Sequence, residues 1–185
     1  MTTNLRKDAV RSRRAILGAA RELYRDDTEA SFAEISQEAG VGQATVYRHF
    51  ADRRALLVAL AEEDMGALEE RLAAEPIDPE SLEALLREMI AAQLRSQGLI
   101  AAIRAGEVEE SQVERLTERV RALVAPRLEA ARTAGLVRPD LTADDALTVL
   151  AMVDGAVAAL RDRAERERAS ARAFEIALDG LRVRA

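Results

Sequence analysis

Apolar side chains recur every three or four residues along most of the chain, the spacing that places them on one face of an α-helix. The first such pattern covers about residues 7–25, and two short ones follow at about 32–39 and 43–50. A longer pattern, opened by Asp52 as a capping residue, continues to about residue 74. No segment shows the two-residue alternation of a half-buried strand. The hydrophobic pattern therefore predicts an all-α fold.

Five more helices are expected in the rest of the chain. Their approximate ranges are 79–97, 98–106, 111–134, a segment that begins after Thr142, and 169–183. Asp78 and Pro79 are typical of a helix start, because a capping residue is followed by proline in the first turn. Pro126 lies inside the third of these helices and should kink or split it, since proline removes a backbone donor. The chain is thus predicted to form about nine helices.

A helix-turn-helix is predicted between Ser31 and Phe50. Ser31 and Glu34 have the spacing of a capping box, in which the hydroxyl accepts from the Glu34 amide and the carboxylate reaches back. Gly40 ends the first short helix, because glycine readily adopts the left-handed conformation of a sharp turn. Two short helices joined in this way are typical of a DNA-binding motif whose second helix enters the major groove.

The second helix of this motif has an apolar face and a mixed polar face. The residues of the motif that are expected to face the core are Ile35, Ala39, Val41, Val46 and Phe50. The residues left on the outside are Gln43, Ala44, Thr45, Tyr47, Arg48 and His49. A purely structural helix has little need for so many different polar groups on two turns. We therefore interpret this face as a surface that reads DNA.

Base contacts are expected from three of these side chains. Gln43 can form a bidentate pair with adenine, Arg48 can form one with guanine, and Ala44 can touch a thymine methyl group. The alternative for Gln43 and Arg48 is that both are simply solvated.

Phosphate contacts are expected from a second set, which consists of Ser31, Thr45, Tyr47, His49 and Arg53. Arg53 falls in the first turn of the next helix, where its guanidinium and the positive helix end both favour a phosphate. Tyr47 could instead pack against the first helix, and His49 could be structural. A metal-binding role for His49 is not expected, because the chain has no Cys and no second His.

Charge is distributed unevenly along the chain, whose net charge is −6. Residues 1–57 carry ten Lys or Arg and eight Asp or Glu, whereas the remainder carries 17 and 25. This asymmetry indicates that only the N-terminal end faces a polyanion. The basic residues of this end, which could contact the DNA backbone or merely solvate a helix face, are Arg6, Lys7, Arg11, Arg13 and Arg14.

Several classes of protein are excluded by composition. The absence of Cys removes disulfides, thiol catalysis and thiolate metal sites, and neither a catalytic triad nor a zinc site has its parts. We therefore expect no enzyme, no cofactor and no metal. No apolar stretch approaches the roughly 20 residues of a membrane span, so we expect no membrane association and a cytoplasmic protein.

The segment Phe32–Leu57, FAEISQEAGVGQATVYRHFADRRALL, closely resembles the N-terminal DNA-binding domain of the TetR (tetracycline-repressor) family of bacterial transcriptional regulators. A weaker similarity, to the family's junction between its seventh and eighth helices, covers residues 130–150 and the pair Asp154–Gly155. The resemblance implies a nine-helix homodimer, in which the first three helices bind DNA and the fifth to ninth form a domain for ligand binding and dimerisation. Gly42 departs from the family's frequent Ser, Ser36 from its usual alanine, and Arg53 from its usual lysine.

We therefore expect a helix-turn-helix DNA-binding domain at residues 1–57 and a helical-bundle domain for ligand binding and dimerisation at 58–185. The expected function is that of a ligand-responsive repressor that binds a palindromic double-stranded DNA operator as a homodimer. The eighth and ninth helices should form the dimer face as a four-helix bundle, because Gly155 and its neighbouring alanines allow close approach. The alternatives are a helical protein-binding module and a regulator without a small-molecule effector.

An effector cavity in the second domain should be aliphatic, because Phe174 is the only aromatic residue beyond residue 50. The candidate lining residues are Leu86, Met89, Ile90, Leu94, Ile103, Leu116, Val120, Met152 and Asp154. Ordinary core packing is the alternative for the apolar residues of this set. Asp154 is either an exposed or interface-paired acid, or a cavity acid that selects a cationic effector.

Overall fold

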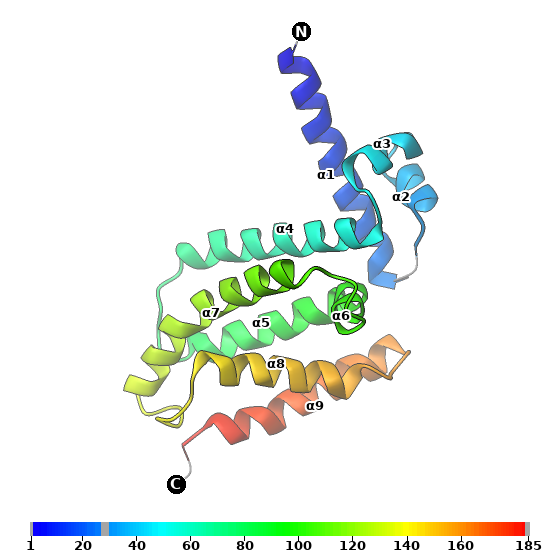
Figure 1. The fold of residues 1–185 in the computed structure, drawn as a ribbon. Coiled ribbons are helices and arrows are strands. Elements are labelled where there is room, and N and C mark those ends of the chain that lie inside the picture. The colour runs from blue at the N-terminus through cyan, green and yellow to red at the C-terminus, as the bar shows by residue number, and fades with distance from the viewer. Residues whose placement is uncertain (1, 27–29, 184–185) are drawn as a thin grey trace. The chain divides into compact units, whose positions relative to one another are not determined.

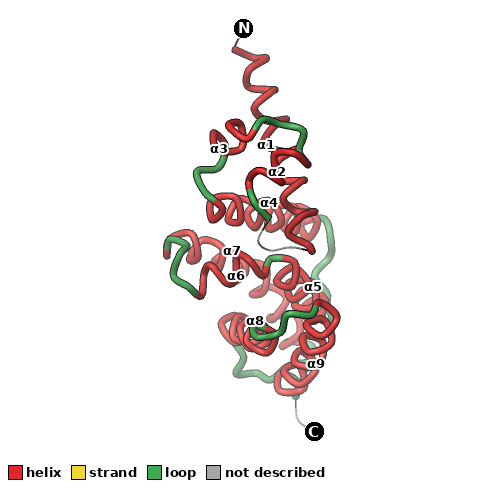
Figure 2. The backbone as a smooth tube through the Cα atoms, turned by 90° about the vertical axis from the view of Figure 1, so that its right-hand side faces the viewer, coloured by secondary structure: helices red, strands yellow, loops and turns green. Residues whose placement is uncertain are grey.

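The computed structural model describes the backbone of residues 2–26 and 30–183, and the side chains of 7–24 and 30–183. Within these ranges the chain forms nine helices and no strand (Figures 1 and 2), which confirms the predicted all-α fold. The helices are α1 (Thr2–Asp26), α2 (Phe32–Glu38), α3 (Gln43–His49), α4 (Arg53–Ala73), α5 (Ser81–Arg95), α6 (Gln97–Arg104), α7 (Glu110–Thr133), α8 (Ala143–Val157) and α9 (Arg163–Leu181).

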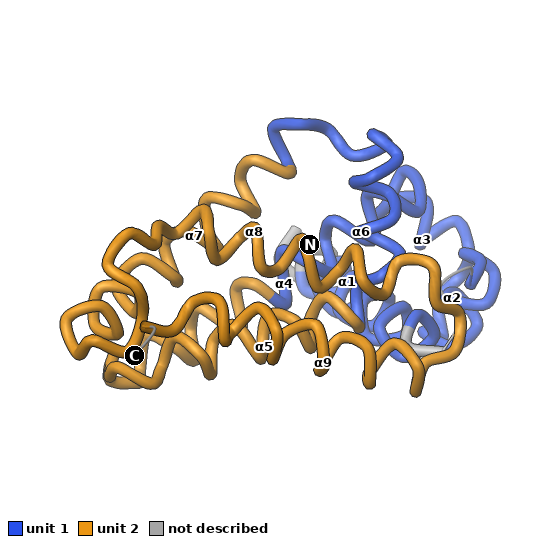
Figure 3. Tube along the Cα trace, turned by 90° about the horizontal axis from the view of Figure 1, so that it is seen from below, with its two compact units in different colours: residues 1–64, 95–112 blue, residues 65–94, 113–185 orange. Residues whose placement is uncertain are grey.

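The chain divides into two compact units, shown in different colours in Figure 3. Unit 1 comprises residues 1–64 and 95–112, and unit 2 comprises residues 65–94 and 113–185. Helix α4 begins in unit 1 and ends in unit 2. The functional boundary expected between residues 57 and 58 is not tested by this division and stays a prediction.

Local hydrogen bonds explain where the helices of the helix-turn-helix begin and end. The Ser31 hydroxyl accepts from the Glu34 amide at 3.3 Å, and the Ser31 amide donates to the Glu34 carboxylate at 2.8 Å, so the predicted capping box is confirmed. Gly40 has a φ of +63°, the left-handed conformation expected at this turn. Gly42 precedes α3 without any side-chain cap.

The core of unit 1 joins α1, α2 and α3 to the start of α4. Its most deeply buried side chains are Ile16, Ile35, Val46, Phe50 and Leu56, each at most 2% exposed. Burial of one such side chain stabilises the fold by roughly 1.5–3 kcal/mol. These contacts fix how α3 is rotated about its own axis.

Unit 2 contains a second core, formed by α5, α7, α8 and α9 with the end of α4. Leu86, Val124, Val153 and Phe174 lie within it and are nearly inaccessible to solvent. Helix α7 is continuous through Pro126, so of the two effects expected from proline the split is wrong, and the kink stays a prediction. Proline has no backbone N–H, so the Ala122 carbonyl does not receive the helical hydrogen bond that residue 126 would otherwise donate. Both Pro126 and Ala122 are exposed, and water can therefore bond to this carbonyl.

Several helix boundaries differ from the sequence-based expectation. Helix α9 begins at Arg163 and not near residue 169, because the Asp162 side chain accepts from the Glu165 amide at 2.8 Å. Helix α5 begins at Ser81, two residues after Pro79. Helix α8, in contrast, begins after Thr142 as expected, and Thr142 forms a capping box with Asp145.

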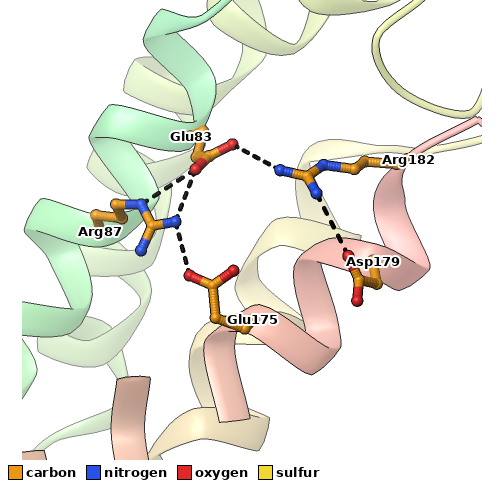
Figure 4. Close-up of polar contacts among 5 residues, drawn as sticks. All are labelled: Glu83, Arg87, Glu175, Asp179 and Arg182. Atoms are coloured by element: carbon orange, nitrogen blue, oxygen red, sulfur yellow. Dashed lines mark hydrogen bonds and ion pairs between the residues drawn. The ribbon is translucent and has the colours of Figure 1, made fainter. Parts of the chain in front are cut away.

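A network of charged side chains joins α5 to α9 within unit 2 (Figure 4). Arg87 contacts Glu83 and Glu175, each at 2.7 Å, while Arg182 lies 3.4 Å from Glu83 and 3.3 Å from Asp179. All five groups are partly solvated, so each pair contributes only about 0.2–1 kcal/mol. The network orients the two helices more than it stabilises them.

Two glycines of unit 1 provide a matched test of these backbone conformations. Gly40→Ala should lower the free energy of unfolding by about 1–2 kcal/mol, because alanine is strained at positive φ. Gly18→Ala, inside α1, should raise it by up to about 1 kcal/mol, because alanine favours a helix. An added Cβ meets nothing within 4 Å at either position. Urea unfolding of both variants measures the two effects, and a loss of stability in both would contradict the conformational explanation.

Candidate nucleic-acid interface

Helix α3 is held against the rest of unit 1 by one buried side. Val46 is fully buried and Phe50, which caps the C-terminal end of α3, is 2% exposed. The Tyr47 ring meets the Phe32 ring edge-on, with centroids 5.1 Å apart. Tyr47 thus contacts α2, and 55% of it remains exposed, while its packing against the first helix stays a prediction.

The opposite side of α3 is exposed, as the sequence predicted. Gln43, Ala44 and Arg48, the three residues expected to contact bases, are all on the surface. Arg48 lies back along its own helix: Nη2 donates to Thr45 Oγ1 at 2.8 Å and Nε donates to the Ala44 carbonyl at 3.3 Å. Both bonds are at the surface, where water or a base edge can replace them. These three positions stay predictions as base contacts.

The residues expected to contact phosphate are arranged less uniformly. Thr45 and His49 are half-buried, and Tyr47 keeps its ring edge on Phe32. Ser31 is exposed at the start of α2, but its hydroxyl also donates to the Glu34 carboxylate at 2.6 Å. A phosphate at Ser31 would therefore compete with the capping box.

Arg53 is directed toward other parts of unit 1. Its Cζ lies 5.5 Å from the centre of the Tyr24 ring, and an ideal Cβ on Gly98 would lie 3.1 Å from its Nη2. The side chain is half-buried between α1 and the first turn of α6. A phosphate contact requires this side chain to turn, so the predicted role of Arg53 depends on what holds it here. Neither Tyr24 nor Gly98 carries a sequence signal that indicates this contact.

The start of α4 is fixed on both sides. Asp52 accepts from the Ala55 amide at 2.8 Å and caps the helix, as expected. Arg54 pairs with Asp52 at 2.8 Å and donates to the Glu107 carbonyl at 2.7 Å. The segment after α6 is thereby bonded to the helix that directly follows α3.

The basic residues of α1 differ in their surroundings. Lys7, Arg11 and Arg14 are exposed, and Arg11 pairs with Asp8 at 2.7 Å. Arg13 lies over the Phe50 ring, with its Cζ 4.8 Å from the centroid. The Arg6 side chain lies outside the described residues.

The surroundings of His49 favour its neutral form. Burial, together with the positive charges of Arg13 and Arg48, lowers the pKa of His49 below its ordinary value of 6.5. The described residues contain no group of three potential metal ligands. Within the same residues, no helix is long and apolar enough to cross a membrane.

The residues proposed for an effector cavity are not all brought together. Leu86, Met89 and Ile90 lie in the core of unit 2, against which Val120 packs, while Leu94 and Leu116 are half-buried. Ile103 belongs to unit 1. Met152 is 57% exposed on α8, whereas Asp154 is buried. The cavity stays a prediction.

Models of known protein families match both the N-terminal and the C-terminal part of the chain. A family model described as the C-terminal domain of SbtR-like transcriptional regulators matches residues 78–183. A second, described as bacterial regulatory proteins of the tetR family, matches residues 16–60. The chain belongs to the TetR family. Proteins of this family are transcriptional regulators that bind DNA and are not enzymes.

Individual TetR-family proteins resemble the chain over different lengths. The HTH-type transcriptional repressor LfrR of Mycolicibacterium smegmatis is 40% identical over an alignment of 88 residues, which covers 45% of this chain and 44% of LfrR. The chain thus spans about half of the curated relatives it matches. A TetR regulatory protein from Mycobacterium vanbaalenii has a similar structure (TM-score 0.66, 30% identity), covering 97% of this chain and 99% of that one. One from Streptomyces coelicolor has a TM-score of 0.63 and 27% identity, with coverages of 94% and 99%.

The single histidine of this TetR-family chain permits a direct test of its environment. Because its folded pKa is lowered, the folded state resists protonation, and stability falls as the pH drops below about 6.5. A proton NMR titration should give a midpoint below that value. His49→Gln should remove this component of the pH dependence of unfolding. A midpoint above 6.5, or an unchanged pH profile in the variant, would contradict the assignment.

Proposed function

We propose that this TetR-family regulator is a repressor that binds a palindromic DNA operator as a homodimer and releases it when a small molecule binds. The observation that carries the proposal is the exposed face of α3, which presents Gln43, Ala44 and Arg48 while Val46 is fully buried. The name of LfrR, a transcriptional repressor, supports repression over activation.

In this proposal, the three exposed residues of α3 recognise the base sequence of the operator. Arg48 pairs with guanine after it exchanges its two surface hydrogen bonds, and Gln43 pairs with adenine. Thr45, Tyr47 and His49 flank this face and contact phosphates, together with Ser31 and Arg53. His49 would gain a proton near a phosphate, so operator affinity should rise as the pH falls.

Electrostatics keeps the acidic part of the protein away from DNA. Residues 1–57 have a small excess of basic side chains, and the rest of the chain has a large excess of acidic ones. The exposed Lys7, Arg11 and Arg14 extend the basic surface along α1. Repulsion of the acidic part and attraction of the basic end orient the protein on the duplex.

Dimerisation is proposed through the outer sides of α8 and α9, which lie side by side in unit 2 (Figures 1 and 2). Met152 on α8 and Ile176 on α9 are each 57% exposed, so both helices present a large apolar side chain that a second copy would cover. Gly155 and Ala156 add small exposed surface on α8 that permits close approach of a second copy. Two such pairs of helices would form a four-helix bundle.

The dimer would have states that differ in the spacing of its two α3 helices. A small-molecule effector would act by binding more tightly to the state whose spacing does not match the operator. Operator half-sites lie about one helical turn, roughly 34 Å, apart. The effector can lower operator affinity only by its differential affinity for the two states, typically about 1–3 kcal/mol. We place this activity in the cytoplasm, where the operator is.

Selection of bound duplexes from a random DNA library tests the proposal as a whole. The full chain should enrich a site with two inverted half-sites, because a twofold dimer presents two copies of α3. A pool without any enriched sequence would contradict the proposal that the protein is a sequence-specific regulator. Enrichment of a single, unrepeated half-site would contradict only the proposal that it binds as a homodimer.

Variants of α3 should separate base reading from general binding. Gln43→Ala and Arg48→Ala should each weaken operator binding by about tenfold or more and relax the preference at one base pair, because a bidentate contact is lost. Gln37→Ala, on the exposed side of α2, is the matched control and should change little. Fluorescence anisotropy at several salt concentrations gives the affinities. Equal effects at positions 37 and 43 would exclude base reading by Gln43.

A charged substitution on α9 should disrupt the dimer. Ile176→Glu should weaken self-association by at least about tenfold, because the interface would bury an unpaired carboxylate. Ile77→Glu changes another exposed isoleucine, in the segment between α4 and α5, and should leave association unchanged. Sedimentation velocity measures both. A variant at position 176 that remains fully dimeric would place the interface elsewhere.

A further inference from the structure

A pocket of about 190 Å³ lies within unit 1, among α1, α4 and the start of α6. Its apolar lining consists of Tyr24, Leu57, Leu60 and Leu99, all of them buried. Its polar lining consists of Arg21, Asp64, Arg95 and Ser96. None of these residues belongs to the cavity expected in the C-terminal part of the chain.

Two arginines line this pocket, and among the described residues only one of them is paired with acidic side chains. Arg21 lies 2.6 Å from Asp64 and 2.9 Å from Glu63, so its guanidinium already has two carboxylate partners within unit 1. Arg95, the last residue of α5, has no hydrogen bond or ion pair with any residue that the structure describes. The pocket therefore combines an apolar interior with a single guanidinium that is available to an anion.

The size of the pocket limits its occupant. A cavity of about 150 Å³ lined by apolar side chains accommodates benzene. The volume here, about 190 Å³, leaves space for one ring and one small polar group. The Ser96 hydroxyl, which makes no capping hydrogen bond at the start of α6, lies beside Arg95 and can donate to the same group.

Two lining residues also hold Arg53. The Tyr24 ring lies under its guanidinium, and Gly98 allows the guanidinium to approach α6. Arg53 is the first residue of α4, four positions after the end of α3. A molecule that contacts Tyr24 and Gly98 thus touches the two groups that keep Arg53 from the surface.

We propose that this pocket is an effector site for a small monoanionic molecule with one apolar ring, of the class of single-ring carboxylates. The ring packs among Leu57, Leu60 and Leu99, and the carboxylate accepts from Arg95 and Ser96. Occupancy changes the position of Arg53 at the start of α4 and lowers operator affinity. This regulatory consequence, but not the binding itself, rests on the proposed function.

Benzoate is the probe for the binding step, titrated calorimetrically into the full-length chain without DNA. Arg95→Gln should weaken binding by about tenfold, because a charge-assisted hydrogen bond is lost. Arg104→Gln, an exposed arginine of α6 that does not line the pocket, should bind benzoate as the unsubstituted chain does. Benzyl alcohol, of similar size and without charge, should bind the unsubstituted chain about tenfold more weakly than benzoate.

The outcomes of this titration decide the site. Absence of benzoate binding overturns the proposal. Equal binding by the Arg95 and Arg104 variants also overturns it, and so does equal binding of benzoate and benzyl alcohol. The comparison of the two ligands uses the unsubstituted protein, so it remains decisive even if a variant folds poorly.

A second measurement tests the regulatory step on a duplex enriched from the random library. Saturating benzoate should reduce affinity for that duplex at least about fivefold in the unsubstituted chain, and the Arg95→Gln variant should need about ten times more benzoate to reach the same reduction. Binding of benzoate with no change in affinity would overturn the regulatory role. Failure to enrich any duplex would instead count against the proposed function, and the titration without DNA would still report on the pocket.

Discussion

Burial of Val46 and Phe50 is the constraint on which the DNA-facing surface depends. Consecutive residues of an α-helix differ in direction by about 100°, so a rotation of α3 by one position would expose Val46 and bury Tyr47. Each buried apolar side chain would forfeit roughly 1.5–3 kcal/mol in such a rotation. The outward direction of Gln43 and Arg48 is therefore a result of what the other side of the helix must bury. Their own interactions, two surface hydrogen bonds of Arg48, are too weak to set it.

The same core also organises the charged groups at its edge. Arg13 covers the Phe50 ring and Arg53 covers the Tyr24 ring, so two arginines near the proposed DNA surface are oriented by aromatic side chains of the core. Arg54 is bonded to Asp52 and to the Glu107 carbonyl. The end of α3 and the start of α4 are thus fixed by side chains of α1 and by a backbone carbonyl of the segment after α6. A change at any of these contacts alters the surroundings of α3 without touching its exposed residues.

Local signals predicted the helix-turn-helix well, and the main differences lie at the start of α9 and at Pro126. The capping boxes at Ser31 and Thr142 are complete within four residues, so the sequence contains all of their parts. The first turns of α9 have no large apolar residue, and hydrophobic spacing therefore placed its start too late. Continuity through Pro126 depends on the solvation of one side of α7, which its sequence does not specify.

In the candidate site too, some features could be predicted from local sequence and others could not. The exposure of Gln43, Ala44 and Arg48 follows from helical spacing over eight residues. The direction of Arg53 depends on Tyr24 and Gly98, which are distant from it along the chain, and no local pattern indicates either contact. The proposed cavity residues share an apolar character with every core residue, so composition could not separate Met152, which is exposed, from Leu86, which is fully buried.

The aromatic residues of the chain are concentrated in a way that has a practical consequence. There is no tryptophan, and the two tyrosines, Tyr24 and Tyr47, both belong to unit 1. Tyr47 stands on the exposed side of the helix-turn-helix, and Tyr24 lines the pocket beneath Arg53. The tyrosine emission of the unlabelled protein therefore originates at these two places alone. Replacing either tyrosine by phenylalanine leaves a single tyrosine, which reports on the helix-turn-helix or on the pocket without a contribution from unit 2.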